Sequence, residues 1–357
     1  MLPARLASCA RAWLPVVALC LGLASPAHAD RWFGSVAVTC DSFAECGLWP
    51  DMPEPPADPA LLFLLRTGTA NAPLQVVVRV NKPVEGGVPI RLTLGEATFE
   101  LQPGTDVLTR RESFNGVEHL TGYSIAPNRV DALLAAMRQA NRGRLRLAVA
   151  GAPQEREIRL DGMDEALRYV DERQGRNGAQ DALIDKGARE PADAAAPKAL
   201  TARDTWPKPI ARIFKREKCE ERLATFDELS TGFVAMPAPG RELWKIPCAG
   251  GDYNILFILI DVRNGNAKTA RVLTFPTQLR KRPSNVLVNP VWWDARNEIW
   301  AFHRNRSFGD CGTVARYRWA ARGFVLIDER RKEDCDDKFV DPWTRWPVTR
   351  PGRGPRR

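Results

Sequence analysis

The sequence predicts a β-rich α+β protein with two domains, an antiparallel N-terminal domain that contains two helices and a C-terminal β-rich meander. Short apolar runs bounded by glycine, proline and asparagine recur in both halves, which is typical of antiparallel strands. Two segments of the first half instead space their apolar residues as one face of a helix. A stretch rich in proline and alanine, residues 176–209, separates the halves and indicates a linker.

The N-terminal α+β domain is expected over residues 30–175. Asn128 is expected to open a helix, with Asp131 at its third position in an arrangement like a capping box. A second helix is predicted at about 163–173. A proline-rich loop, 49–59, cannot join a central strand. The predicted strands are 31–40, 61–66, 74–80, 88–94 and 97–102 before the first helix, and 144–149 and 156–160 after it.

The C-terminal β-rich domain is expected over residues 210–349. A helix is predicted near 218–229. Asn264-Gly265 predicts a tight hairpin, because both central positions of such a turn need a positive φ. The basic, proline-rich tail 350–357 is expected to be disordered. The predicted strands and hairpins of this domain are 241–247, 253–262 with 268–275, 292–303, and 317–328.

The first 29 residues have the features of a signal peptide. Arg5 and Arg11 give a positive start, an apolar run follows at 12–24, and Ala27-His28-Ala29 is a small-residue cleavage signal. We therefore expect a periplasmic protein whose signal peptide is cleaved after Ala29. Cleavage would leave 328 residues (357 minus 29).

Two other membrane attachments are conceivable and are disfavoured by the sequence. An uncleaved anchor would need a longer apolar run than 12–24. A lipoprotein modified at Cys20 would need a small residue where Leu19 stands. No later segment is long and apolar enough to be predicted as a membrane span.

Cysteine usage agrees with export. Two of the eight cysteines lie in the predicted signal peptide, so six remain, and an even number indicates disulfides in an oxidising compartment. Six cysteines allow 15 pairings. A zinc site is the competing interpretation, which the absence of any C-x-x-C spacing disfavours. Proximity in sequence favours the pairs Cys40–Cys46, Cys219–Cys248 and Cys311–Cys335.

Charge is distributed unevenly along the chain. Residues 30–175 hold 16 Lys and Arg against 20 Asp and Glu, a net charge of −4. Residues 206–357 hold 29 against 18, a net charge of +11. An acidic half joined to a basic half indicates either different partners for the two halves or halves that face each other.

Three short motifs carry a family resemblance. They are Cys40-Asp41-Ser42 with Cys46, Leu243-Trp244-x-x-Pro247-Cys248 with Gly251-Asp252-Tyr253-Asn254, and Gly309-Asp310-Cys311-Gly312. On these motifs the chain resembles the bacterial family called domain of unknown function 1176, over nearly the whole mature sequence. The N-terminal half also resembles the invasion-associated locus B family, in which a strand ending in a Cys-Asp turn precedes a second cysteine.

These resemblances imply an exported, soluble periplasmic protein with no assigned activity, and they bring no catalytic residues to carry over. The chain departs from the family at two motif positions. Members often have Ala where Asp252 stands and Asn where Ser42 stands. These departures weaken the case that the two loops bind one fixed ligand.

The sequence identifies no catalytic residue, no cofactor and no metal site. The mature chain has two histidines, His119 and His303, in different halves. Catalysis by a nucleophile that a histidine activates is therefore disfavoured. The G-x-S-x-G, H-E-x-x-H, Walker A and Rossmann motifs are missing. The acidic residues around Cys335 lack EF-hand spacing, so they are interpreted as a solvated loop rather than a calcium site.

Two groups of residues are candidates for ligand binding. Asp310 lies among glycines beside Arg304 and Arg306, and two arginine forks suit a carboxylate or phosphate. The alternative is that Asp310 caps a turn and pairs with Arg306 to fix a disulfide loop. Tyr253 and Asn254 precede the most apolar strand, where they line a pocket or, alternatively, satisfy local backbone groups.

The function we expect is a non-catalytic binding or interaction module of the cell envelope. The basic runs 280–282 and 330–332 indicate an anionic envelope component as the partner, or alternatively a solvated cationic face. Another envelope protein is the second candidate partner. Nucleic acid is not expected. Two rival functions stay open. One is a carboxylate-dependent hydrolase of envelope polymers, since two acids cleave glycosides without histidine. The other is a host-interaction or attachment factor.

Overall fold

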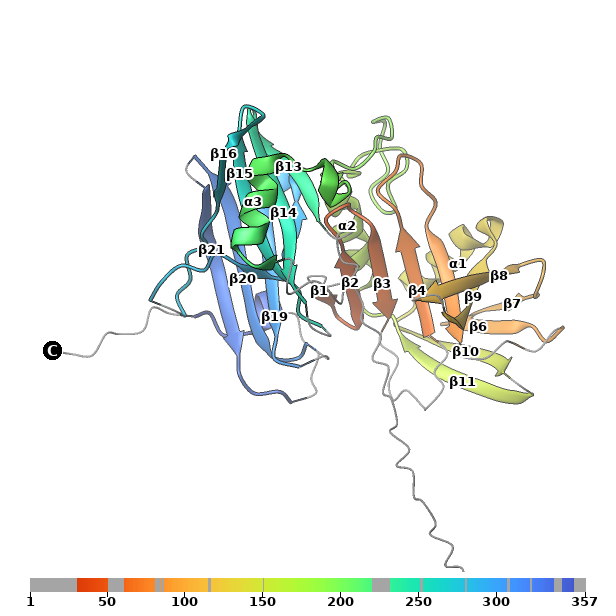
Figure 1. The fold of residues 1–357 in the computed structure, drawn as a ribbon. Helices are drawn as coiled ribbons and strands as arrows, with labels where there is room; N and C mark the ends of the chain where they lie inside the picture. The colour runs from red at the N-terminus through yellow and green to blue at the C-terminus, as the bar shows by residue number, and fades with distance from the viewer. Residues whose placement is uncertain are drawn as a thin grey trace, which may run out of the picture.

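A computed structural model places four antiparallel sheets and their covering helices in a two-part molecule (Figure 1). It describes residues 31–349 except for 51–60, 81–83, 85–86, 115–116, 150, 220–231, 251–252, 280, 307–308, 322 and 337–341. The β-rich α+β fold class predicted from the sequence is confirmed. The signal peptide, the C-terminal tail, most of the proline-rich loop and most of the helix predicted near 218–229 lie outside the described residues.

The N-terminal half contains two sheets and two helices that share one core. The larger sheet has the order β1-β2-β3-β4-β5-β9-β8, and the smaller one has the order β11-β10-β6-β7. The helices α1 (Pro127–Gln139) and α2 (Met163–Arg173) pack against β5 and against β1 and β2, respectively. The strands are β1 (Arg31–Phe33), β2 (Val36–Cys40), β3 (Cys46–Pro50), β4 (Leu61–Arg66), β5 (Gln75–Val80), β6 (Ile90–Leu94), β7 (Ala97–Leu101), β8 (Val107–Phe114), β9 (Val117–Ile125), β10 (Arg142–Val149) and β11 (Ala152–Arg159).

Local chemistry explains where this half differs from the prediction. The predicted strand 31–40 is two strands, because Gly34 turns the chain with a φ of 56° where a side chain would collide with Asp161. The helix α1 begins at Pro127 and has no side-chain cap, so the cap predicted at Asn128 is wrong; proline at the first position presets the helical φ. The sequence analysis missed β3, β8 and β9.

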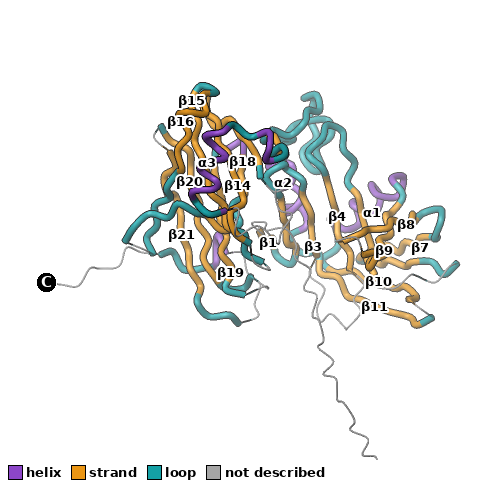
Figure 2. Tube along the Cα trace, in the orientation of Figure 1, coloured by secondary structure: helices purple, strands orange, loops and turns teal. Residues whose placement is uncertain are grey.

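The C-terminal half is a sandwich of two sheets with one helix on its outer face (Figure 2). One sheet has the order β12-β13-β14-β15-β16, with β17 paired to β15, and the other has the order β18-β19-β20-β21. Aromatic and branched residues from both sheets meet between them, and Asn264-Gly265 forms the predicted hairpin turn. The strands are β12 (Lys198–Ala199), β13 (Phe233–Ala238), β14 (Arg241–Ala249), β15 (Leu256–Arg263), β16 (Asn266–Val272), β17 (Leu287–Val288), β18 (Val291–Trp293), β19 (Glu298–Arg304), β20 (Gly312–Ala320) and β21 (Gly323–Lys332).

The helix α3 (Lys208–Arg216) covers the outer face of the larger sheet of the sandwich. Its apolar side, Ile210, Ile213 and Phe214, is buried against that sheet. This helix was not predicted from the sequence, because the prolines at 207 and 209 were interpreted as linker residues. Proline at the start of a helix is instead favourable, since the first backbone N–H groups have no helical partner.

The two halves pack against each other through aromatic side chains. Trp293 and Trp300 of the sandwich belong to the same apolar cluster as the N-terminal sheets, and Tyr169 of α2 meets Trp293 edge-on. In the other direction, Phe43 of the N-terminal half packs against the core of the sandwich. The smaller sheet of the sandwich is therefore covered on both faces.

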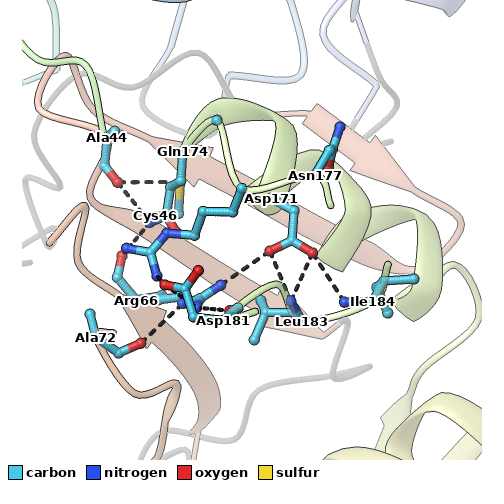
Figure 3. A network of polar contacts seen from close by, with 12 residues as sticks. Ala44, Cys46, Arg66, Ala72, Asp171, Gln174, Asn177, Asp181, Leu183 and Ile184 are labelled. Carbon is cyan, nitrogen blue, oxygen red and sulfur yellow. Dashed lines mark hydrogen bonds and ion pairs between the residues drawn. The ribbon is translucent and has the colours of Figure 1, made fainter. Parts of the chain in front are cut away.

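The end of α2 forms a buried polar network with the chain that follows it (Figure 3). The Asp171 carboxylate accepts hydrogen bonds from the backbone N–H groups of Leu183 and Ile184 and from the Arg66 guanidinium. Residues 176–190, at the start of the predicted linker, thus lie against the N-terminal half. The division into domains at the predicted boundaries stays a prediction.

Gln174 ties the first disulfide loop to this network. Its side-chain amide, 2% exposed, donates to the carbonyls of Ala44, Arg66 and Thr67 at 2.9, 3.1 and 3.1 Å. Cys40 and Cys46, which close the loop that contains Ala44, form a disulfide.

Replacing Gln174 is expected to destabilise the protein. Gln174→Ala removes the hydrogen bonds to three backbone carbonyls, of which that of Thr67 keeps a donor in Arg176, and should lower the free energy of unfolding by about 2–4 kcal/mol. Urea unfolding of the disulfide-bonded protein, followed by tryptophan fluorescence, measures the change. Gln180→Ala removes the same side chain from an exposed position and is the control, with an expected change within about 0.5 kcal/mol. Equal losses in the two variants would contradict the role assigned to Gln174.

Candidate functional site

The structure brings the five predicted ligand-binding residues together at one end of the sandwich. Tyr253 and Asn254 precede β15, and Arg304 ends β19. The Asn254 side-chain amide donates to the Arg304 carbonyl at 2.8 Å and accepts from the Arg304 backbone N–H at 3.1 Å. The side chain thus bonds to Arg304 as the backbone of a neighbouring strand would. The Tyr253 hydroxyl donates to the carbonyl of Asn305 at 3.4 Å.

Arg306 and Asp310 pair within the loop that follows. Two guanidinium nitrogens of Arg306 donate to the two oxygens of the buried Asp310 carboxylate, at 2.8 and 2.5 Å. Gly309, with a φ of 75°, turns the chain between them. These contacts fix the conformation of the loop, and we call the hydrogen bonds among Tyr253, Asn254, residues 304–306 and Asp310 the loop brace. A ligand-binding role for the five residues stays a prediction.

The three disulfides predicted by proximity are present in the structure. They join Cys40 to Cys46, Cys219 to Cys248 and Cys311 to Cys335. The Asp310 carboxylate lies within 4.8 Å of the two sulfurs of the third bridge. Because a metal ion binds thiolates and these sulfurs are bonded to each other, this group is not a metal site in the oxidised protein.

Asn289 completes the brace and was missed in the sequence analysis. Its side chain is 1% exposed, accepts from the N–H of Ile255 at 2.7 Å, and donates to the carbonyls of Tyr253 and Phe302, both at 3.0 Å. Its backbone has a φ of 47°, a left-handed conformation that asparagine tolerates. An asparagine before Pro290 predicts a turn, but nothing in the sequence indicates contacts with two distant strands.

A second polar cluster, also missed, surrounds Asp261 in the middle of the sandwich. Asp261 is fully buried, and Arg241 donates to both its oxygens at 2.8 and 2.7 Å. Arg271 donates at 2.9 Å, and Arg263 lies 3.9 Å away. Three guanidinium groups thus surround one carboxylate, which leaves this cluster with a net charge of +2.

A cavity of about 360 Å³ adjoins the Asp261 cluster. It lies between β16, the segment after it and the turn that joins β20 to β21. Most of the described lining residues are apolar, and Arg271 is the charged residue among them. The lining residues are Arg271, Val272, Leu273, Thr274, Pro276, Pro283, Ala320, Gly323, Phe324 and Val325.

The exposed side of α3 is uniformly cationic. Lys208, Arg212 and Lys215 follow one another at helical spacing, with Ala211 between them, and all four are exposed. Among the residues described, none of these three cations forms an ion pair with a carboxylate. Their charge is therefore presented to the surroundings.

Lys245 is the most unusual titratable group of the sandwich. Its side chain is 5% exposed, and its ammonium lies 4.2 Å from the centre of the Phe257 ring and 5.1 Å from that of Phe233. Burial lowers the pKa of Lys245 to about 7, although the negative charge of Asp41 opposes this shift.

Comparison with known proteins places the chain in a family. Residues 30–350 match the family described as "Protein of unknown function (DUF1176)". The chain belongs to this family. The predicted membership of this family is thereby confirmed, whereas the resemblance of the N-terminal half to the invasion-associated locus B family stays a prediction. No helix within the described residues has the length and apolar character needed to cross a bilayer.

One curated relative is an uncharacterized protein, YpfG of Escherichia coli (strain K12). It is 24% identical over 212 residues, which are 54% of this chain and 60% of YpfG. The chain thus matches less than two thirds of the relative's length. No solved structure matches.

Replacing Asn289 tests the brace. Asn289→Gly keeps the left-handed backbone accessible but removes the four hydrogen bonds of this buried side chain, so the free energy of unfolding should fall by about 2–4 kcal/mol. Asn297 has a φ of 51° and an exposed side chain, so Asn297→Gly is the matched control, with an expected change of a few tenths of a kcal/mol. Urea unfolding compares the two variants, and similar losses would show that backbone conformation alone matters.

Lys245 should make stability depend on pH. Between the folded pKa of about 7 and the unfolded value of 10.5, the unfolded state binds more protons, so stability should rise with pH in this window. The gain is at most about 1.4 kcal/mol per pH unit. Lys245→Met should remove this rise of stability with pH, whereas Lys268→Met, at an exposed lysine, should keep it. Unfolding measured from pH 6 to 10 gives the slopes, and an unchanged slope in Lys245→Met would contradict this assignment.

Proposed function

We propose that this protein is exported to the periplasm and acts by binding an anionic component of the cell envelope, without catalysis. The N-terminal sequence features and three disulfides support export, because such bonds persist in oxidising compartments. The observation that carries the binding proposal is the cationic side of α3.

The α3 surface differs from other basic surfaces of the chain. On β10, the exposed Arg144 and Arg146 lie against Glu155 of β11, and Arg142 lies against Glu157, so acidic neighbours offset their charge. On α3, Lys208, Arg212 and Lys215 have no such neighbours among the described residues. A row of unopposed cations on a helix anchored by a buried apolar side fits an anionic surface.

The buried carboxylates of the C-terminal half favour binding over hydrolysis. Asp261, Glu298 and Asp310 each accept hydrogen bonds from arginine, and Glu329 accepts from the Thr277 hydroxyl and the Gln278 N–H. These carboxylates are thus engaged in hydrogen bonds within the sandwich, whereas a glycosidase needs two carboxyl groups that face its substrate. The alternative of an attachment factor rests on the resemblance to invasion-associated locus B.

Charge removal on α3 tests the proposal. The triple variant Lys208→Gln, Arg212→Gln, Lys215→Gln should bind vesicles containing phosphatidylglycerol about 100-fold more weakly, at about 1 kcal/mol per cation. Sedimentation with vesicles at low salt measures the binding. Binding of the unaltered protein should weaken strongly at high salt and be absent on phosphatidylcholine vesicles.

The control variant carries the same loss of charge elsewhere. Arg142→Gln, Arg144→Gln, Arg146→Gln removes three cations from β10 and should leave vesicle binding within about threefold of the unaltered protein. Equal weakening in the two triple variants would mean that net charge, not α3, drives binding. Binding that does not respond to salt would overturn the proposal.

A further inference from the structure

The third disulfide differs from the other two in its exposure to solvent. Cys335 is exposed, whereas its partner Cys311 is fully buried. The four cysteines of the other two bonds, Cys40, Cys46, Cys219 and Cys248, are each at most 3% exposed. Of the three disulfides, the bond between Cys311 and Cys335 is therefore the one that a molecule in solution can reach in the folded protein.

The two ends of this bond are held differently. Cys311 accepts a backbone hydrogen bond from the N–H of Asn305 at 3.1 Å and directly precedes β20. Cys335 instead lies in the segment 333–336, which is outside helices and strands. One sulfur is thus anchored in the sheet, and the other lies on a segment that can move when the bond opens.

Two ion pairs on the surface join this segment to the end of β21. The Glu333 carboxylate lies 2.9 Å from Arg331, and the Asp336 carboxylate lies 2.5 Å from Lys332. Both carboxylates are exposed, at 69% and 41%. Exposed ion pairs of this kind stabilise little, so these two oppose a movement of Cys335 only weakly.

The neighbouring strands do not depend on this bond. β20 and β21 pair with each other from the turn at Ala320 and Gly323 to Gly312 and Lys332, which lie beside the disulfide. The bond closes the open end of this hairpin, so breaking it leaves the ladder of backbone hydrogen bonds in place. A thiol can therefore open this disulfide without unfolding the sandwich.

We propose that Cys335 is a site to which a low-molecular-weight thiol attaches reversibly by thiol–disulfide exchange. The thiolate attacks Cys335 Sγ from the exposed side, in line with the S–S bond, and Cys311 leaves as a thiolate. A new S–S bond forms at Cys335 as the old one breaks, and Cys311 takes up the proton that the thiol lost. The sulfur of the thiol is oxidised and that of Cys311 is reduced, so no other reactant is needed.

The anchored position of Cys311 makes the attachment reversible. Because Cys311 stays at the start of β20, its thiolate can attack the mixed disulfide at Cys335 and expel the thiol. This return is an intramolecular reaction, which proximity favours. Attachment should therefore require an excess of thiol and should reverse when the thiol is removed.

Peptide mapping after treatment with 2-mercaptoethanol tests the proposal on the folded, disulfide-bonded protein. Acid stops the exchange, and mass spectrometry of the peptides locates the thiol. 2-Mercaptoethanol should be found on Cys335, with Cys311 as a free thiol, and should be lost after the reagent is removed. Attachment at Cys311 or first at any other cysteine, or no attachment to the folded protein, would overturn the site.

The bond between Cys219 and Cys248 is a matched internal control. It spans 29 residues against 24 for the proposed site, and both its cysteines are buried. The bond between Cys311 and Cys335 should open about tenfold faster or more. Urea below the unfolding transition should accelerate opening of the control bond and leave the rate at Cys335 within about twofold. Equal rates, or equal responses to urea, would contradict the proposal.

Removal of the bond gives a second test. The double variant Cys311→Ser, Cys335→Ser should take up no thiol under conditions in which the unaltered protein does, and urea unfolding checks that it folds. Uptake equal to that of the unaltered protein would place the thiol elsewhere. None of these measurements involves α3, so failure of this proposal and failure of envelope binding are distinguishable.

Discussion

The polar end of α2 is the contact on which the arrangement of the molecule depends. Asp171, Arg173, Gln174 and Arg176 are all buried, and together they bond to several separate segments of the chain. Asp171 holds residues 183–184, Gln174 holds the first disulfide loop, and Arg176 bonds to the carbonyls of Thr67 and Thr69. Arg173 donates to the carbonyl of Asp41 in its own half at 2.9 Å and to the carbonyl of Trp292 in the other half at 3.3 Å.

This junction adds directed contacts to the apolar interface, in which Trp293 and Trp300 pack against the core of the N-terminal half. Arg173 lies over the Trp293 ring at 4.6 Å, and Arg296 covers the same ring at 3.9 Å and pairs with Glu172. An arginine can bury its stem and stack its planar group while its N–H groups reach backbone carbonyls. The two halves thus meet through a shared apolar cluster and through a few directed arginine contacts.

The sequence predicted those parts of the fold that depend on local patterns. The second helix, the Asn-Gly hairpin and the three disulfides were readable because spacing alone determines them. The buried polar network at the end of α2 could not be predicted, because this segment has the composition of an exposed helix terminus. Burial of such residues depends on segments about 100 residues away, such as Arg66 and Trp292, and no local pattern encodes that distance.

The candidate sites show the same division. Arg306 and Asp310 could be paired from their spacing, but Asp261 could not be matched with Arg241 and Arg271. A bulge shifts the register between β15 and β16, so the regular pairing expected from the hairpin turn does not predict which side chains meet. The sequence does contain one signal, an aspartate inside an otherwise apolar strand, which requires a cationic partner once it is buried.

The distribution of charge argues for a protein that binds. Three buried carboxylates of the sandwich, those of Asp261, Glu298 and Asp310, pair with arginines. On α3, Lys208, Arg212 and Lys215 have no carboxylate opposite them among the described residues. Exposed cations gain little from surface ion pairs within the chain, so leaving them unopposed costs the fold little. Stability and surface charge can therefore be set independently, with the disulfides and the α2 junction holding the scaffold. A scaffold of this kind can present a fixed row of cations to a large anionic partner without any moving part.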